Sequence, residues 1–316
     1  MKIIIKQSHI VYLIVLITVL AISLWYLSGK TRYAKVRESF AENKCVVYKL
    51  QNRVGVGLFS DVGFLTESYI RAKRANLDFY VDSSNWSYKH TNGWSDYFNS
   101  LKECPPNVSE LYTTVVHCAH EKVDTSIDNN HKMYIKDYEK AIKEIIVFND
   151  TVKQMANAEM TKYGVYESLF IRRGDKIISE SPFKSTQDIL NQCKFNNSLP
   201  LYVQSDDYTE IENVKSLVSN KRIVYMVPET KKGWHSSTQI AMTPEQKKTD
   251  TLEFLAGMYI CVMSQKCYVD MLSNVGRFIK LYAPEKVEIY ILGSEKPVYY
   301  SDKEILQCIS YETSFM

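Results

Sequence analysis

The chain has 316 residues, of which 45% are hydrophobic and 24% are charged, a globular composition that excludes a wholly disordered protein. Its formal net charge of +3 is too small to indicate nucleic-acid binding as the main function. Glycine and proline, with 11 and 8 residues, are too scarce for a collagen-like or low-complexity chain.

An apolar segment near the N-terminus, residues 10–27, contains no charged residue, glycine or proline. It is just long enough for a helix to cross a bilayer, and Trp25 and Tyr26 lie at its end, where amphipathic rings favour the headgroup level. Because bulky residues occupy the positions where a cleavage site needs small ones, an uncleaved anchor is favoured over a cleaved signal peptide. We expect a cytoplasmic tail and transmembrane helix over residues 1–28 and a polar stem over residues 29–44.

The flanks of this anchor leave its orientation open. More basic residues follow the segment than precede it, which favours a cytosolic body. Four Asn-x-Ser/Thr sequons oppose that orientation, because they accept glycans only in a lumenal or extracellular chain, and they begin at Asn85, Asn107, Asn149 and Asn196. Seven cysteines weakly favour the lumen as well, since disulfides persist there. The rival use of cysteine, a zinc site near Cys118, has too tight a ligand spacing.

The globular body begins at residue 45, and its first domain is expected to span residues 45–160. A strand over 46–50, a turn at Gly55-Val56-Gly57, a helix over 62–76 and a strand over 77–82 together predict a βαβ unit. The polar segment 105–130 predicts irregular structure. Apolar residues at helical spacing over 134–160 predict a helix that Asn149-Asp150 can divide in two.

The second domain, residues 161–316, alternates strands with helices. Strands are expected over 166–171, 199–205, 222–227 and 258–263, and helices over 208–219, from about Asp250 with Thr249 or Asp250 as its cap, and from Ser264. Residues 228–249 are rich in breakers and predict a loop. This alternation is typical of a parallel sheet covered on both faces. Ligands of such sheets bind at the carboxyl ends of the strands, where Arg172, Asp206 and Ser264 stand.

The most informative segment is residues 170–176, Phe-Ile-Arg-Arg-Gly-Asp-Lys, with Glu180 four residues further on. Charges are expensive to bury without partners, so this cluster at a strand end indicates an anionic ligand. The planar fork of arginine suits phosphate in particular. Two alternatives remain: a solvated charged turn, and the adhesion tripeptide Arg173-Gly174-Asp175.

These residues and four other segments, in the same order, resemble the core α1,6-fucosyltransferases, glycosyltransferase family 23, over about residues 45–285. Arg172-Arg173-x-Asp175-Lys176 with Glu180 is similar to that family's central motif, and residues 84–94 resemble its Gln-Asn-Trp-Arg-Tyr-Ala-Thr-Gly-Gly-Trp segment. The remaining similar segments are the glycine turn at 55–57, the strand 201–207 with its paired aspartate, and residues 250–267.

The resemblance implies a GT-B-like fold of two Rossmann-type halves facing a cleft. It also implies an inverting enzyme that moves fucose from GDP-fucose to a hydroxyl of an N-glycan or a related N-acetylglucosamine-containing acceptor. No metal and no further cofactor are implied, and the enzyme would be a single-pass type II protein of the Golgi membrane with a lumenal catalytic part.

The same resemblance assigns roles to residues. Glu180 would be the general base that takes the acceptor proton, Arg172 would grip the β-phosphate, and Asp175 and Lys176 would hold their surroundings. Tyr88 would contact guanine, and Asp250 its N–H groups. The implied donor-binding set is Gly55, Gly57, Tyr88, Arg172, Arg173, Asp206, Asp207, Asp250, Ser264 and Gln265. Implied disulfides are Cys261–Cys267 and Cys45–Cys104, with buried free thiols as the alternative.

The sequence departs from the family at two positions. Phe170 replaces a histidine that helps to hold the nucleotide, and Gly174 replaces a threonine. No segment is similar to the family's coiled-coil stem or SH3-like domain, so specificity for the chitobiose core is not implied. The alternatives are a transferase with another sugar nucleotide, a peptide O-fucosyltransferase, and a non-catalytic glycan-binding relative.

Overall fold

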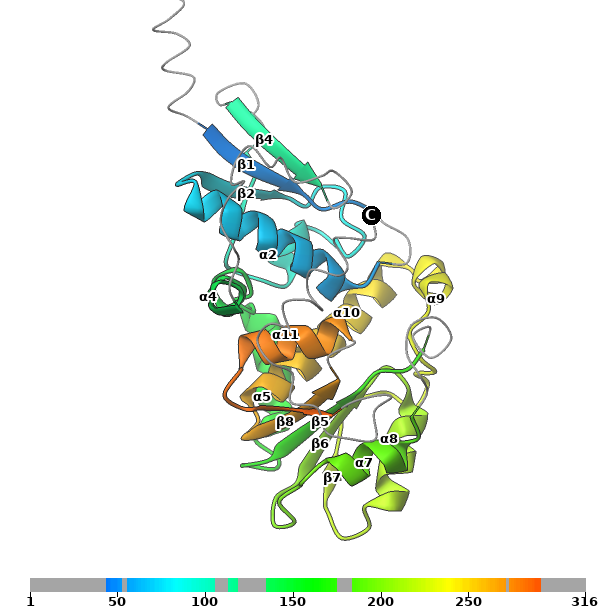
Figure 1. The fold of residues 1–316 in the computed structure, drawn as a ribbon. Helices are drawn as coiled ribbons and strands as arrows, with labels where there is room; N and C mark the ends of the chain where they lie inside the picture. Colours follow the sequence, from blue (N-terminus) through cyan, green and yellow to red (C-terminus); the bar gives the residue numbers. More distant parts are fainter. Residues whose placement is uncertain are drawn as a thin grey trace, which may run out of the picture. The chain divides into compact units, whose positions relative to one another are not determined.

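The computed structural model describes residues 44–52, 56–105, 113–118, 135–174, 184–270 and 273–290 (Figure 1). The chain divides into two compact units, one of residues 1–45 and 105–115 and the other of residues 46–104 and 116–316. Within the described ranges no helix is long and apolar enough to cross a membrane. The predicted anchor at residues 10–27 lies outside those ranges.

A four-stranded sheet contains β1 (Lys44–Lys49), β2 (Asp78–Asp82), β3 (Lys102–Glu103) and β4 (Thr113–Cys118), in the order β3-β2-β1-β4. The strands predicted at 46–50 and 77–82 are thereby confirmed. The irregular structure predicted for residues 105–130 is wrong where β4 forms. The sequence of β4, Thr-Thr-Val-Val-His-Cys, is rich in the β-branched residues that favour a strand.

Helix α2 (Leu58–Arg74) connects β1 with β2 and begins four residues before the predicted start. Gly57 is its N-cap residue, and Asp61 in the first turn complements the positive end of the helix. Its buried face includes Leu58, Val62 and Leu65, at the spacing of an amphipathic helix.

The predicted division of the next helix is confirmed, because α4 (Ile135–Ile145) and α5 (Asp150–Met160) are separate. Asn149 lies between them and caps α5, since its side-chain oxygen accepts the N–H of Val152 at 3.1 Å.

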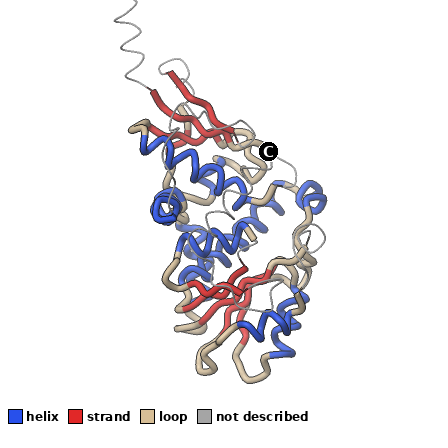
Figure 2. Tube along the Cα trace, viewed as in Figure 1, coloured by secondary structure: helices blue, strands red, loops and turns tan. Residues whose placement is uncertain are grey.

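The second sheet is entirely parallel, as predicted. Its strands are β5 (Glu167–Ile171), β6 (Leu201–Ser205), β7 (Ile223–Val224), β8 (Lys266–Asp270) and β9 (Val287–Tyr290), in the order β7-β6-β5-β8-β9. Its helices are α7 (Thr186–Gln192), α8 (Tyr208–Leu217), α9 (Ser236–Ala241), α10 (Pro244–Met263) and α11 (Asn274–Tyr282). Helices cover both faces (Figure 2), so every residue of β5 and β6 is buried.

Alternate residues of β5 pack into different cores. Leu169 and Ile171 belong to the cluster that includes residues of α7 and α8, whereas Phe170 packs with residues of α10. Phe170 is therefore a core residue, only 1% exposed. Its place in the strand accounts for an apolar side chain where the resemblance expects histidine.

The strand predicted at 258–263 is wrong, because these residues form the last turns of α10. A buried helix and a buried parallel strand both give an unbroken apolar run, which periodicity cannot distinguish. The helix begins at Pro244, where Thr243 and Gln246 form a capping box. Asp250 thus lies inside the helix and is not its cap. Part of the loop predicted at 228–249 is α9.

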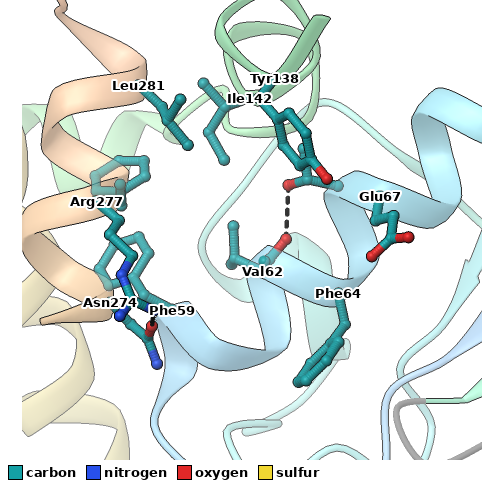
Figure 3. A pocket seen from close by; sticks show the side chains of 12 residues that line it. Phe59, Val62, Phe64, Glu67, Tyr138, Ile142, Asn274, Arg277 and Leu281 are labelled. Carbon is teal, nitrogen blue, oxygen red and sulfur yellow. Dashed lines mark hydrogen bonds between the residues drawn. The ribbon is translucent and has the colours of Figure 1, made fainter. Parts of the chain in front are cut away.

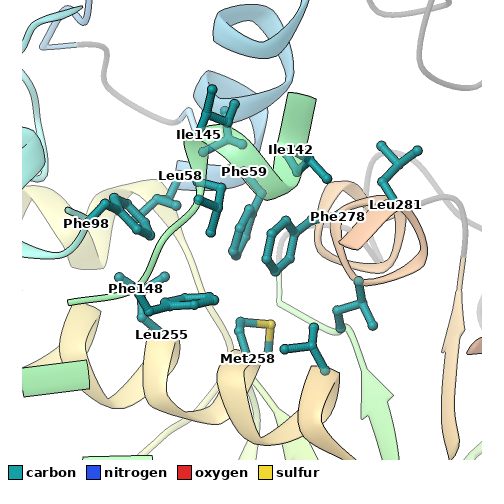
Figure 4. Close-up of a cluster of buried hydrophobic side chains, with 14 of the residues drawn as sticks. Leu58, Phe59, Phe98, Ile142, Ile145, Phe148, Leu255, Met258, Phe278 and Leu281 are labelled. Carbon is teal, nitrogen blue, oxygen red and sulfur yellow. The ribbon is translucent and has the colours of Figure 1, made fainter. Parts of the chain in front are cut away.

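A cluster of buried side chains from α2, α4, α10 and α11 forms the largest core (Figure 4). In this cluster the rings of Phe59 on α2 and Phe278 on α11 stack with their centroids 4.1 Å apart. Leu255 and Met258 of α10 are completely buried in the same cluster. The core therefore draws residues from both predicted domains, and the domain boundary at residue 160 stays a prediction.

Candidate functional site

Arg172 and Asp206 come together because two parallel strands end side by side. Ile171, the last residue of β5, lies opposite Ser205, the last residue of β6. The next residue of each strand therefore leaves the sheet at the same edge, where α/β proteins bind their ligands. The Arg172 Nη1 donates to the Asp206 Oδ2, and the two side chains are only 12% and 11% exposed.

The Asp206 carboxylate also fixes the backbone around it. Its Oδ1 accepts the N–H of Arg173 at 2.6 Å, and its Oδ2 accepts the N–H of Trp234 at 3.0 Å. The Arg172 guanidinium lies over the Trp234 ring, 5.5 Å from the centroid, in a cation–π contact. Arg172 is therefore held on one side by a carboxylate and on another by an aromatic face.

Gly174 allows the loop that carries Trp234 to approach this closely. Its φ of +62° is a left-handed conformation, and a Cβ there would lie 2.3 Å from the Trp234 carbonyl oxygen. A threonine, which the resemblance expects at this position, cannot be accommodated in this arrangement. The departure at Gly174 thus has a packing cause.

Arg173 points into the fold and not toward the Arg172 edge. Its Nε and Nη2 lie 2.9 and 3.1 Å from the two carboxylate oxygens of Glu210 on α8. Glu210 also accepts the hydroxyl of Thr186 at 2.5 Å. Arg173 is 3% exposed, and the buried Glu210 carboxylate neutralises its charge.

Tyr88 interacts electrostatically with Arg172 at this edge. Its hydroxyl donates to the Val56 carbonyl oxygen at 3.0 Å, and it also contacts the Gln239 side chain of α9. Burial raises the pKa of Tyr88 and the charge of Arg172 opposes this rise, so the phenol stays protonated at neutral pH. Tyr88 thus interacts with Gln239 through a side-chain hydrogen bond and with Arg172 through its charge, although these residues are distant in the sequence.

The loop that carries Tyr88 is organised by Asp96, in the short 3-10 helix η1 (Gly93–Asp96). The Asp96 carboxylate accepts four backbone N–H groups, at 2.8 to 3.0 Å, from His90, Thr91, Asn92 and Gly93. Burial raises the pKa of Asp96, but these donors together hold it below its usual range. Nearby, the Tyr97 hydroxyl donates to the Tyr88 carbonyl at 2.8 Å.

Several predicted donor-binding residues cap a helix or form an ion pair within the fold. Asp207 caps α8 by accepting the N–H of Thr209 at 2.9 Å, and Gly57 is the N-cap residue of α2. The Asp250 carboxylate accepts from the ammonium of Lys231. Of the predicted donor-binding residues, Arg172 and Asp206 are therefore the pair that the structure places in direct contact, and Tyr88 interacts with Arg172 electrostatically.

The prediction that Ser264 and Gln265 open a helix is wrong. Both residues follow the C-terminal end of α10. The dipole of a helix is negative at that end, which is unfavourable for phosphate. Ser264 is fully buried, and its hydroxyl donates to the Cys261 carbonyl at 2.7 Å and contacts the Ser168 hydroxyl at 2.8 Å. Gln265 is exposed, and its N–H donates to the Tyr166 carbonyl.

The remaining predictions fall partly outside the described residues. Gly55, Asn107, Asp175, Lys176 and Glu180 belong to segments that the structure does not describe. Asn85 and Asn196 are exposed, whereas both polar atoms of the Asn149 side chain are used in hydrogen bonds.

Cys261 and Cys267 are completely buried thiols that hydrogen-bond to each other, and burial raises the pKa of Cys261. Cys45 is buried on β1, and Cys104 directly follows β3. Both predicted disulfides stay predictions.

A separate cavity of about 50 Å³ lies between α2, α4 and α11 (Figure 3). Its lining is largely apolar, with Phe59, Tyr138 and Phe278 among the residues. It includes none of the residues around Arg172. Over the described part of the chain, no group of three or more histidine, cysteine or carboxylate side chains is arranged to hold a metal ion.

No family model and no curated protein matches the chain in sequence. Solved structures do match. A mutant of Arabidopsis thaliana FUT1 in complex with GDP is 12% identical with a TM-score of 0.51, over 82% of this chain and 73% of that one.

Two structures of the fucosyltransferase NodZ also match, each over 82% of this chain and 98% of that one, with a TM-score of 0.52. The first, described as an α-1,6-fucosyltransferase soaked with GDP-fucose, is 10% identical. The second, from Bradyrhizobium, is 11% identical. The chain therefore has the α/β fold with parallel sheets that these fucosyltransferases share.

Proposed function

We propose that the protein is a fucosyltransferase that moves fucose from GDP-fucose to a hydroxyl group of a glycan. The fold supports this proposal, because structures with the same fold hold GDP or GDP-fucose. The observation that carries it is the position of Arg172, which Asp206 and Trp234 fix at the ligand-binding edge of the parallel sheet.

Fixing Arg172 serves the chemistry of this transfer. As the bond from fucose to the diphosphate breaks, negative charge grows on the leaving GDP. A cation that is already oriented stabilises this charge without reorganising during the reaction. Asp206 supplies the orientation, and its contacts with two backbone N–H groups keep it in place.

The acceptor side of the mechanism rests on Glu180, eight residues after Arg172. In our proposal its carboxylate takes the proton of the acceptor hydroxyl while the hydroxyl oxygen attacks the sugar carbon, with inversion. Asp175 and Lys176 position this segment. Arginine provides the positive charge at the diphosphate, so the transfer proceeds without a divalent metal.

We infer an α1,6-type linkage to an N-acetylglucosamine-containing acceptor, on the resemblance of residues 172–180 to the core α1,6-fucosyltransferases. The GT-B-like arrangement of two Rossmann-type halves belongs to the same proposal. The apolar segment 10–27 supports a type II anchor in the Golgi membrane, which exposes the catalytic part to GDP-fucose in the lumen.

The proposal is tested with the full-length chain in detergent, incubated with GDP-fucose and EDTA, with and without a panel of N-glycans. We expect GDP release that requires an acceptor and falls at least about 100-fold in Arg172→Ala. The matched control is Arg222→Ala, because the Arg222 side chain is exposed and donates to the Lys162 carbonyl at 3.2 Å.

Glu180→Gln separates an enzyme from a glycan-binding relative. An enzyme loses turnover and retains GDP binding, whereas a binding protein retains glycan binding unchanged. Failure of the wild-type chain to bind GDP-fucose would contradict the proposed donor.

A further inference from the structure

The diphosphate of a sugar nucleotide carries more than one negative charge, and Arg172 already shares its charge with Asp206. Arg173, the second arginine of the motif, is buried against Glu210. A further cation at the same edge would therefore serve the site. The ammonium of Lys231 interacts electrostatically with Asp206.

The backbone of Lys231 is anchored beside the end of β6. Its carbonyl oxygen accepts the N–H of Tyr208, the first residue of α8, at 2.9 Å. Its own N–H donates to the Pro228 carbonyl at 3.0 Å, and the next residue, Lys232, forms an antiparallel bridge with Asp207. The base of the Lys231 side chain is therefore fixed, and only its flexible stem has to move to bring the ammonium to a ligand.

The Lys231 ammonium pairs with Asp250 on α10, and Glu253 on the same helix also interacts with it. The two paired side chains remain 23% and 27% exposed, so the pair is accessible to a ligand. Burial lowers the pKa of Lys231, while Glu253 and Asp206 favour its charged form. Arg172 and Lys231 thus both act on Asp206, one by direct contact and one at longer range.

We propose that Lys231 is a second phosphate-binding residue, which pairs with Asp250 in the free protein and moves to the diphosphate when the nucleotide sugar binds. This inference rests on the proposed function and extends its donor site. Asp250 acts as a competitor of the phosphate for the same ammonium. Binding therefore requires the exchange of one anionic partner of Lys231 for another.

The test measures binding of GDP, guanosine and inorganic pyrophosphate to the full-length chain by calorimetry. Lys231→Met is expected to weaken GDP and pyrophosphate binding about tenfold, the usual effect of losing one charge-assisted hydrogen bond. Guanosine, which lacks phosphate, is expected to bind as before. Lys231→Arg retains the charge and is expected to bind pyrophosphate within about threefold of the wild type.

Lys232→Met is the matched control, since it removes the same charge from the neighbouring, exposed side chain. It should leave the affinity for pyrophosphate unchanged. If Lys231→Met and Lys232→Met bind pyrophosphate equally well, the inference is wrong.

Asp250→Asn tests the competition from the other side and does not depend on how well Lys231→Met folds. Releasing the ammonium should tighten pyrophosphate binding several-fold, and the gain should disappear in the double variant with Lys231→Met. Looser or unchanged binding in Asp250→Asn would contradict the exchange.

The two proposals fail in different ways. Binding of GDP that is insensitive to Lys231→Met overturns the role of Lys231 and leaves the transferase proposal intact. Pyrophosphate binding that depends on Lys231, without any binding of GDP, overturns the donor assignment and retains the phosphate site. A wild-type chain that binds neither compound overturns both.

Discussion

Gly174 and Gly233 touch through their backbones, and a Cβ added to Gly233 would lie 2.9 Å from the Gly174 Cα. Both have positive φ angles, of +62° and +84°. The contact brings the segment after β5 against the loop that carries Trp234. The geometry around Arg172 therefore depends on two residues that have no side chain.

Gly174→Ala is expected to destabilise the protein, because the new methyl group overlaps the Trp234 backbone in addition to the cost of a positive φ. The matched control is Gly164→Ala, since Gly164 also has a positive φ of +68° but open space around it. We expect Gly174→Ala to lower the free energy of unfolding by about 1 to 3 kcal/mol more than the control does. Urea unfolding of both variants measures this, and equal losses would show that the close contact is unimportant.

The Arg173–Glu210 pair is expected to act on stability and not on donor affinity. Arg173→Met leaves the Glu210 carboxylate buried without its cation, which costs about 3 to 5 kcal/mol of unfolding free energy. Lys136→Met breaks a pair whose lysine is 79% exposed and should cost less than about 1 kcal/mol. Chemical denaturation compares the two, and the GDP affinity of the folded Arg173→Met protein should match that of the wild type. A large loss of affinity without a loss of stability would place Arg173 at the donor.

Asp96 is expected to make the stability of the Tyr88 loop depend on pH. Its pKa in the folded protein lies below its ordinary value of 3.8, so its contribution is complete above about pH 5 and is lost as the pH falls through the lower folded pKa. Asp96→Asn removes this contribution. The difference in unfolding free energy between wild type and variant should therefore be largest near neutral pH and shrink toward pH 2. A difference that stays constant over this range would contradict the role of the charge.

Cys261 and Cys267 are expected to form a disulfide when the protein matures in an oxidising compartment, because the two thiols are hydrogen-bonding partners in the folded chain. Mass spectrometry of a non-reduced digest should then show the two linked peptides. Cys193 serves as the comparison, because its thiol donates to the Ile189 carbonyl oxygen at 3.3 Å and not to another cysteine. Recovery of Cys261 and Cys267 only as alkylated thiols, from protein secreted or retained in the lumen, would rule the pairing out.

The sequence predicts the parts of the fold that local chemistry controls. Residues 166–171 and 199–205 form strands of one parallel sheet, and the convergence of Arg172 and Asp206 follows from their positions just after these strands. The break at Asn149 is visible in the sequence for a similar reason, since asparagine is a favoured N-cap residue.

Other features depend on tertiary packing and were missed. Residues 258–263 form an unbroken apolar run, so the sequence does not distinguish the end of a buried helix from a buried strand. Trp234, Gln239 and Lys231 lie in a segment predicted as a loop, and no motif marks them. Arg172 and Arg173 are consecutive, and only the structure shows which one faces the core. The signal that the sequence offers for this segment is Trp234, a single large aromatic residue among the helix-breaking and polar residues of 228–249.

The stacked rings of Phe59 and Phe278 have a consequence for how the protein melts. Phe59 lies on α2, which follows β1, and Phe278 lies on α11, which follows β8. Unfolding of the elements around either sheet therefore exposes buried side chains of the core that both sheets share. We therefore expect one cooperative calorimetric transition for both sheets. A nucleotide that binds near Arg172 would then protect amide protons along the whole of α2 from exchange as effectively as those in β6.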